Sequence, residues 1–251
     1  MRRRALLGSG DGQVVPQMTL GYVDGMIMLL DGIENTLTGH SSSATELMDL
    51  SNNGNVLDFP TTNNPLLYNW QNNHLSITNG STNQAAKTAT GIKINDIPIV
   101  SLSEYTIEMR IRMPNVQPKV NANLAYFSSV GVYPQMQFIL LNNTTPRISI
   151  NLPAYSAMAK PGTYNLGWFT ISAAFYGLEL KIYFDGIYAN MMGGSSILQE
   201  LLSKYFSLGG VSFDNTHNGC IDVANVRIYP IALSAQQILD NYNNDINRGL
   251  I

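Results

Sequence analysis

Residues 104–113 decide the fold, and their sequence is Glu-Tyr-Thr-Ile-Glu-Met-Arg-Ile-Arg-Met. Polar and apolar side chains alternate along this stretch, so that every second residue from Tyr105 to Met113 is apolar. A period of two is typical of a strand that buries one face and leaves the other in contact with solvent. The stretch therefore predicts a half-buried strand of an antiparallel sheet.

Five further segments have strand patterns, and clusters of Gly, Pro, Asn and Asp separate them. They are residues 124–129, 135–141, 147–152, 168–175 and 178–184. Asp185-Gly186 follows the last of them and indicates a two-residue hairpin turn. Successive strands without helical segments between them predict an all-β protein, an antiparallel two-sheet jelly-roll β-sandwich.

The end of the chain predicts one more strand and one short C-terminal helix. Residues 219–229 have a strand pattern that stops at Pro230, which cannot donate a ladder hydrogen bond. Ser234 and Gln237 have the spacing of a capping box, and Leu233 stands where a hydrophobic staple residue is found. We therefore expect a helix that begins after Ser234 and packs on the β domain.

Composition excludes several classes of function. The chain has 251 residues, of which 45% are hydrophobic and only 12% are charged, and its net charge is -3. A mildly acidic chain lacks the basic field of a nucleic-acid binder. The single cysteine, Cys220, allows neither an internal disulfide nor a multi-cysteine zinc or iron–sulfur site. No apolar segment approaches the roughly 20 residues of a membrane span, and the apolar run after Arg4 is too short for a cleaved signal peptide.

Three segments of this chain have the order and the residues of a known family. They are Tyr-Thr-Ile-Glu-Met-Arg-Ile-Arg at 105–112, Leu-Lys-Ile-Tyr-Phe-Asp-Gly at 180–186 and Ile-Asp-Val-Ala-Asn-Val-Arg-Ile-Tyr-Pro-Ile-Ala-Leu-Ser at 221–234. Together with the turn Asp-Leu-Ser-Asn-Asn-Gly-Asn at 49–55, they resemble the laminin-G-like (LamG) members of the concanavalin A-like lectin/glucanase superfamily. The resemblance implies a jelly roll of two antiparallel sheets.

Residues 1–17 are Gly-rich with a basic tip, so we expect an extended N-terminal arm there and a LamG-like domain over residues 18–251.

The superfamily includes glycosidases, which need two carboxylates about 5–9.5 Å apart. Glu104 and Glu108 share a face of the predicted strand, but four residues at ~3.3 Å each separate them by roughly 13 Å. The Glu-x-Asp-x-x-Glu strand of the glucanase branch is absent from the sequence. We therefore predict that the protein is not an enzyme. A glycoside hydrolase with a carboxylate pair distant in sequence is the alternative that stays open.

Aromatic, amide and imidazole side chains gather between residues 68 and 74. Sugar rings pack on aromatic faces, and amides bind sugar hydroxyls. The candidate glycan-binding residues are therefore Tyr68, Trp70, Asn72, Asn73 and His74. In the alternative interpretation, these aromatic rings pack in the core or at its rim.

Four aspartates are candidate calcium ligands, because Ca²⁺ prefers carboxylate oxygens. They are Asp31, Asp49, Asp214 and Asp222. The resemblance implies calcium at loop tips in some members of the family. The alternative is that each carboxylate accepts hydrogen bonds from its own turn, in which case the protein needs no cofactor.

A second resemblance concerns the biological setting. The segments Met-Arg-Arg-Arg-Ala-Leu-Leu at 1–7, Tyr-Val-Asp-Gly-Met-Ile at 22–27 and Asp-Gly-Ile-Glu-Asn at 31–35 resemble openings of LamG-like proteins of gut-bacterial phages. This implies a multi-copy structural protein of the virion, on the capsid or tail, that adheres to surface glycans. Arg2, Arg3 and Arg4 would then dock on an acidic surface of another virion protein. The alternative is a carbohydrate-binding module or adhesin at a bacterial cell surface.

Overall fold

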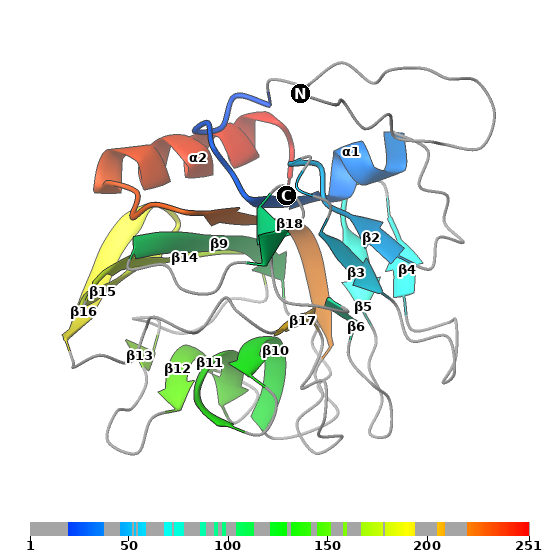
Figure 1. The fold of residues 1–251 in the computed structure, drawn as a ribbon. Coiled ribbons are helices and arrows are strands. Elements are labelled where there is room, and N and C mark those ends of the chain that lie inside the picture. Colours follow the sequence, from blue (N-terminus) through cyan, green and yellow to red (C-terminus); the bar gives the residue numbers. More distant parts are fainter. Residues whose placement is uncertain are drawn as a thin grey trace.

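The computed structural model describes a β-sandwich, over residues 20–37, 46–51, 53, 55–58, 68–71, 73–77, 86–88, 93–94, 97–98, 104–112, 121–129, 132–141, 145–151, 158–159, 167–177, 179–193, 205–208 and 220–250. Its strands form two large antiparallel sheets and a small ribbon of β7 (Lys93–Ile94) with β8 (Ile97–Pro98). Figure 1 shows the two large sheets as layers, with a helix on the outer side of one of them. The predicted all-β jelly-roll architecture is confirmed. The expected arm, residues 1–17, lies outside the described residues.

The first sheet, called sheet A, contains the segment that decided the fold. Its order is β16-β15-β14-β9-β18-β5-β4, and β1 also pairs with β18. The strands are β1 (Met28–Asp31), β4 (Tyr68–Trp70), β5 (Leu75–Ile77), β9 (Glu104–Arg112), β14 (Phe169–Tyr176), β15 (Glu179–Phe184), β16 (Ile187–Gly193) and β18 (Ile221–Tyr229). The strands predicted from the sequence are confirmed to within a few residues at their ends.

The second sheet, called sheet B, has the order β13-β12-β11-β10-β17-β6-β3-β2. Its strands are β2 (Glu46–Met48), β3 (Val56–Asp58), β6 (Ala86–Thr88), β10 (Asn121–Ser129), β11 (Val132–Leu141), β12 (Thr145–Asn151), β13 (Met158–Ala159) and β17 (Tyr205–Leu208). Some paired strands of sheet B, such as β10 and β17, are far apart in sequence, so long crossovers connect parts of this sheet and hairpins connect others.

The alternation along β9 is confirmed, but the expected solvent contact of its polar face is wrong. Ile107, Met109 and Ile111 are buried in the core, as predicted. Glu108 and Arg110 on the other face are also buried, at 0% and 3% exposed. The reason is that α2 (Ala235–Asn247) and the segment before β1 pack over this outer face of sheet A.

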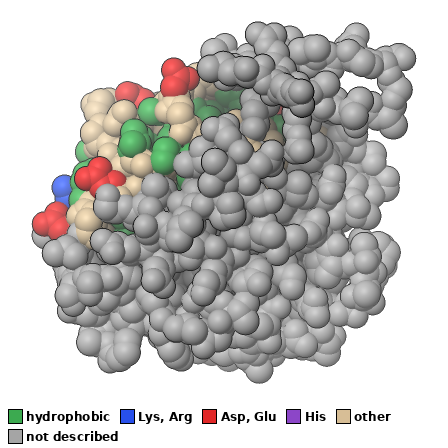
Figure 2. All heavy atoms as spheres, viewed as in Figure 1, with side chains coloured by type: hydrophobic (Ala, Val, Ile, Leu, Met, Phe, Trp, Pro, Cys, Tyr) green, Lys and Arg blue, Asp and Glu red, His purple; other side chains and the backbone are tan. Residues whose placement is uncertain are grey.

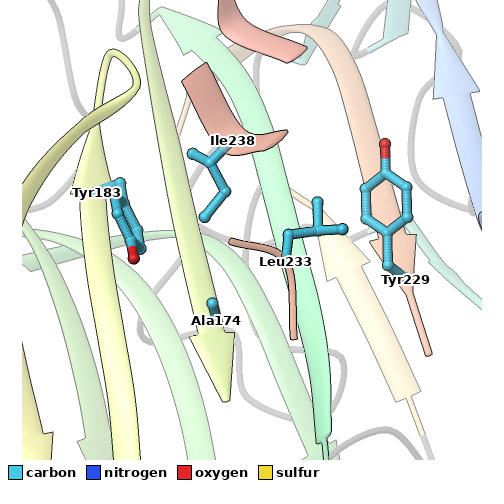
Figure 3. Packing of buried hydrophobic residues seen from close by; sticks show 5 residues of the cluster. All are labelled: Ala174, Tyr183, Tyr229, Leu233 and Ile238. Atoms are coloured by element: carbon cyan, nitrogen blue, oxygen red, sulfur yellow. The ribbon is translucent and has the colours of Figure 1, made fainter. Parts of the chain in front are cut away.

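Helix α2 begins as the sequence predicts. The Ser234 hydroxyl accepts a hydrogen bond from the backbone N–H of Gln237, whose side chain accepts in return from the backbone N–H of Ser234, a complete capping box. Leu233 and Ile238 then pack with Ala174, Tyr183 and Tyr229 on the outer face of sheet A (Figure 3). On the solvent side of α2, Gln236, Asp240 and Asn243 are exposed beside Ile246, and Figure 2 shows acidic, neutral polar and hydrophobic side chains mixed on this face.

Two predicted turns are confirmed. Asp185 and Gly186 both have left-handed backbone, with φ of 52° and 76°, and join β15 to β16. Asp49 is buried in its turn and accepts hydrogen bonds from the backbone N–H groups of Leu29, Ser51 and Asn55. Both turns therefore use the residue types that the sequence offers for them.

Helix α1 (Gly32–Leu37) is a difference from the prediction of one C-terminal helix. Asp31 accepts hydrogen bonds from the backbone N–H groups of Ile33 and Glu34, as an N-cap residue does. The Asp-x-x-Glu spacing of Asp31 and Glu34 is the signal in the sequence that would have predicted it. No helix in the described part of the chain is long and apolar enough to cross a membrane.

Candidate functional site

Four neighbouring strands of sheet A bring polar side chains together at one end of the sheet. Arg112 is the last residue of β9, and its backbone pairs with Asp222 near the start of β18. Asp222 pairs in turn with Ser76 of β5. Trp168 stands immediately before β14, whose first residue, Phe169, pairs with Ile111 of β9. Strand register therefore aligns these side chains in one row across the sheet end.

An ion pair between Arg112 and Asp222 holds the row, and only its aspartate is buried. Nε and Nη2 of Arg112 lie 2.8 and 2.7 Å from Oδ2 of Asp222. The Ser76 hydroxyl donates to Oδ1 of Asp222 at 2.5 Å. The Asp222 side chain is 6% exposed, whereas that of Arg112 is 39% exposed. Asp222 therefore anchors an arginine that still reaches solvent.

Trp168 is the aromatic centre of this cluster and is partly exposed. The guanidinium carbon of Arg112 lies 5.0 Å from the centroid of its ring, within the range of a cation–π contact. The ring of His74 meets the indole at 5.1 Å between centroids with an interplanar angle of 71°, an edge-to-face contact. We call Trp168, Arg112, Asp222, His74 and Asn73 the sheet-end patch.

Asn73 and His74 reach the patch from the tight turn between β4 and β5. The backbone N–H of Gln71 donates to the carbonyl of His74 at 2.9 Å and closes this turn. Nδ2 of Asn73 donates to the carbonyl of Gly249 at 2.9 Å, and Oδ1 of Asn73 lies 2.8 Å from Nδ1 of His74. The chain end after α2 therefore fixes Asn73, and Asn73 fixes the imidazole.

Electrostatics favour the neutral form of His74. Burial lowers the pKa of His74 below its ordinary value, and the charge of Arg112 acts in the same direction, while Asp222 opposes both. At neutral pH the patch therefore carries one positive charge, on Arg112, and one negative charge, on Asp222.

The structure places the predicted glycan-binding residues in different positions. Asn73 and His74 lie in the sheet-end patch. Tyr68 and Trp70 lie in β4, where their backbones pair with Ile77 and Leu75 of β5. Asn72 lies outside the described residues.

Trp168 and Arg112 are not among the predicted site residues, although Trp168 begins one strand pattern and Arg112 lies one residue before the end of another. Such end positions were a usable signal, because ligand-binding side chains concentrate where strands give way to loops.

The comparison with known families identifies the superfamily of this chain. Residues 86–239 match the laminin-G type model described as the concanavalin A-like lectin/glucanases superfamily. The chain belongs to this superfamily. A comparison with curated protein sequences gives no match.

Known structures with this superfamily's sandwich include larger proteins. A Trypanosoma rangeli sialidase has a TM-score of 0.64 and 13% identity, over 96% of this chain and 35% of the sialidase. The binding domain of botulinum neurotoxin serotype D has a TM-score of 0.62 and 12% identity, over 90% of this chain and 52% of that domain. The chain thus spans about a third of the sialidase and about half of the toxin domain, and the likeness shows a shared fold.

The aspartates predicted as calcium ligands have separate roles in the structure and do not form one cluster in its described part. Asp31 caps α1 and contacts Arg248, with Oδ2 2.6 Å from Nη1. Asp49 holds its turn, and Asp222 holds Arg112. Asp214 lies outside the described residues. Across the described ranges no three His, Cys, Asp or Glu side chains form a group that could hold a metal ion. Calcium binding therefore stays a prediction that rests on the family resemblance.

Two other carboxylate pairs among the described residues share an arginine, and each pair includes one residue of a helix. Glu108 and Asp245 both contact Arg227, and all three side chains are 0% exposed. Asp31 and Glu34 both contact Arg248, whose side chain is 14% exposed. Each pair is engaged by a cation, and the four carboxylate side chains are at most 9% exposed, so neither pair is placed as an open acid and base.

Proposed function

We propose that this domain is a non-enzymatic carbohydrate-binding protein and that the sheet-end patch is its binding surface. The observation that carries the proposal is a partly exposed indole, Trp168, flanked by an arginine and an imidazole. Saccharide sites combine an aromatic surface with a few fixed polar groups, and this patch supplies both. The fold it shares with a sialidase and a toxin receptor-binding domain is consistent with such a role.

The proposed absence of enzymatic activity is supported by how the carboxylates are used. A glycosidase needs one carboxyl group that donates a proton and one that attacks or activates water, both facing the substrate. In the patch the carboxylate is Asp222, which already accepts from Arg112 and Ser76. We therefore propose binding without turnover, and released sugar in an incubation with any bound saccharide would contradict it.

We further propose that the protein works as a structural component of a bacteriophage virion, on the capsid or tail. The resemblance of residues 1–7, 22–27 and 31–35 to LamG-like phage proteins supports this setting. In this proposal Arg2, Arg3 and Arg4 dock on other virion proteins. Mass spectrometry of purified particles tests it: many copies per particle are expected. Absence from the particles would favour a module or adhesin at the bacterial surface.

Replacing Trp168 with alanine is expected to weaken saccharide binding at least about tenfold, because the apolar platform of the patch is lost. The measurement is isothermal titration of the purified full chain with a panel of oligosaccharides. The chain contains two tryptophans, so Trp70→Ala is the matched variant. If Trp70→Ala abolishes binding while Trp168→Ala leaves it unchanged, the binding surface belongs to β4 and not to the sheet-end patch.

A further inference from the structure

The charges of the sheet-end patch cancel. Asp222 is the acceptor for two nitrogens of Arg112, and its second oxygen is taken by Ser76. An oppositely charged partner at this distance lowers the attraction of Arg112 for any other anion. With His74 neutral, the patch offers a ligand no net charge.

Asn73 selects one tautomer of His74. Because Nδ2 of Asn73 donates to the carbonyl of Gly249, Oδ1 of Asn73 is the atom that faces Nδ1 of His74. The reverse amide orientation would set two oxygens against each other. A neutral imidazole carries one proton, and this acceptor holds it on Nδ1. Nε2 of His74 therefore keeps its lone pair, and no side chain or backbone group in the described ranges donates to it.

The remaining polar atoms of the patch are donors. Nη1 of Arg112 and the indole N–H of Trp168 have no acceptor among the residues that the structure describes. The patch thus presents one acceptor and two donors around one aromatic ring, which the side chains of Arg112 and His74 both contact. A sugar hydroxyl both donates and accepts, so it matches this set. A carboxylate only accepts, so it would face the lone pair of His74 and the charge of Asp222.

We infer that the sheet-end patch selects neutral saccharides over acidic ones, and that Asn73 acts as a positioning residue by orienting His74 as a hydrogen-bond acceptor. This inference rests on the proposed carbohydrate-binding function. It specifies the chemical class of ligand: uncharged rings with hydroxyl groups that stack on Trp168 and donate a hydrogen bond to Nε2 of His74.

The test uses pairs of oligosaccharides that differ in one group, a neutral hexose in one and the corresponding uronic acid, with a carboxylate in place of the hydroxymethyl group, in the other. The purified full chain is titrated with both members of each pair. The neutral member is expected to bind on the order of tenfold more tightly. Tighter binding of the acidic member, lost in Trp168→Ala, would overturn the selectivity and leave the proposed function standing. If no saccharide in the panel binds, the proposed function itself fails.

Asp222→Asn tests the charge balance directly, because it keeps the shape of the side chain and leaves Arg112 uncompensated. The acidic member of each pair is expected to gain affinity on the order of tenfold relative to the neutral member. Asp240→Asn removes the same charge from the exposed face of α2 and should change neither affinity. Equal effects of the two variants would show that net charge, and not the Arg112–Asp222 pair, sets the preference.

A pH titration of the unaltered protein tests the role of His74 independently of any variant. The charged groups that face His74 are Asp222 of β18 and Arg112 of β9. As the pH falls through the pKa of His74, Nε2 gains a proton and the patch gains a positive charge. The affinity for neutral saccharides is therefore expected to fall while that for acidic ones rises. Parallel changes for both classes would contradict the assignment of His74 as the acceptor.

Discussion

Replacing Arg227 with methionine is expected to lower the free energy of unfolding by about 3–5 kcal/mol, a large share of the roughly 5–15 kcal/mol available to a domain. Arg227 lies between two carboxylates, with Nε 3.1 Å from Oε2 of Glu108 and Nη2 3.0 Å from Oδ2 of Asp245. None of these side chains is exposed. The substitution would leave two buried carboxylates without their cation, although the side chain keeps a similar length.

The pKa shifts in this cluster differ between Arg227 and the carboxylates that it contacts. Burial alone would lower the pKa of Arg227, but Asp245 and Glu108 together raise it well above its ordinary value. Burial raises the pKa of Glu108, and Arg227 only partly opposes this. Asp245 receives two guanidinium nitrogens and Glu108 receives one, so Glu108 is the less compensated of the two carboxylates.

Urea unfolding of both proteins measures the effect, and Arg112→Met is the matched control. Arg112 also pairs with an aspartate on the outer face of sheet A, but its side chain is 39% exposed and its loss leaves one carboxylate unpaired instead of two, so the substitution should cost about 1–2 kcal/mol. The triple variant Arg227→Met, Glu108→Gln, Asp245→Asn should recover part of the lost stability, because neither carboxylate that faced Arg227 stays charged without it. A similar loss in Arg227→Met and Arg112→Met would contradict this account of the cluster.

The sequence predicts the parts of this fold that depend on neighbouring residues. The alternation around Ile107, the Asp185-Gly186 turn and the Ser234 capping box are local patterns, and each forms as predicted. The burial of Glu108, in contrast, depends on residues that are distant in sequence. Its partners include Arg227 and Asn241, which lie 119 and 133 residues further along the chain, so no local pattern reveals that α2 covers the polar face of β9.

The candidate site also has a part that the sequence predicts and a part that depends on strand register. Asn73 and His74 belong to a polar and aromatic run that is visible in the sequence. Trp168, Arg112 and Asp222 join them only through strand register, because β14, β9 and β18 are adjacent in sheet A and distant in sequence. Asp222 was identified as a potential metal ligand from its residue type, whereas the structure shows it paired with Arg112.

Replacing Gly32 with alanine is expected to destabilise the domain by about 1–3 kcal/mol and to weaken saccharide binding to a similar extent as Trp168→Ala. Gly32 is the first residue of α1 and lies directly against the turn that carries Asn73 and His74. A Cβ atom at this position would lie 2.5 Å from the carbonyl oxygen of Asn73 and 2.7 Å from Cα of His74. Both are backbone atoms, so they cannot move aside as a flexible side chain can.

Helix propensity and steric contact make opposite predictions for this substitution. Alanine is favoured over glycine within a helix by up to about 1 kcal/mol, which alone would stabilise α1. The contact at 2.5 Å is far inside van der Waals distance, so either α1 or the turn has to shift. Since α1 is held by its Asp31 cap and follows β1, which pairs with the interior strand β18, whereas the turn joins β5 to the edge strand β4, we expect the turn to move and to carry His74 away from Trp168.

Unfolding in urea and titration with the neutral oligosaccharides measure the two effects on the same samples. Gly167→Ala is the control, because a Cβ there meets nothing within 4 Å although the residue adjoins Trp168. It should change stability by no more than about 0.5 kcal/mol and leave binding intact. If Gly32→Ala loses stability but retains full affinity, α1 has yielded instead of the turn. Loss of both would show that the position of His74 depends on the close approach of α1 that only glycine allows.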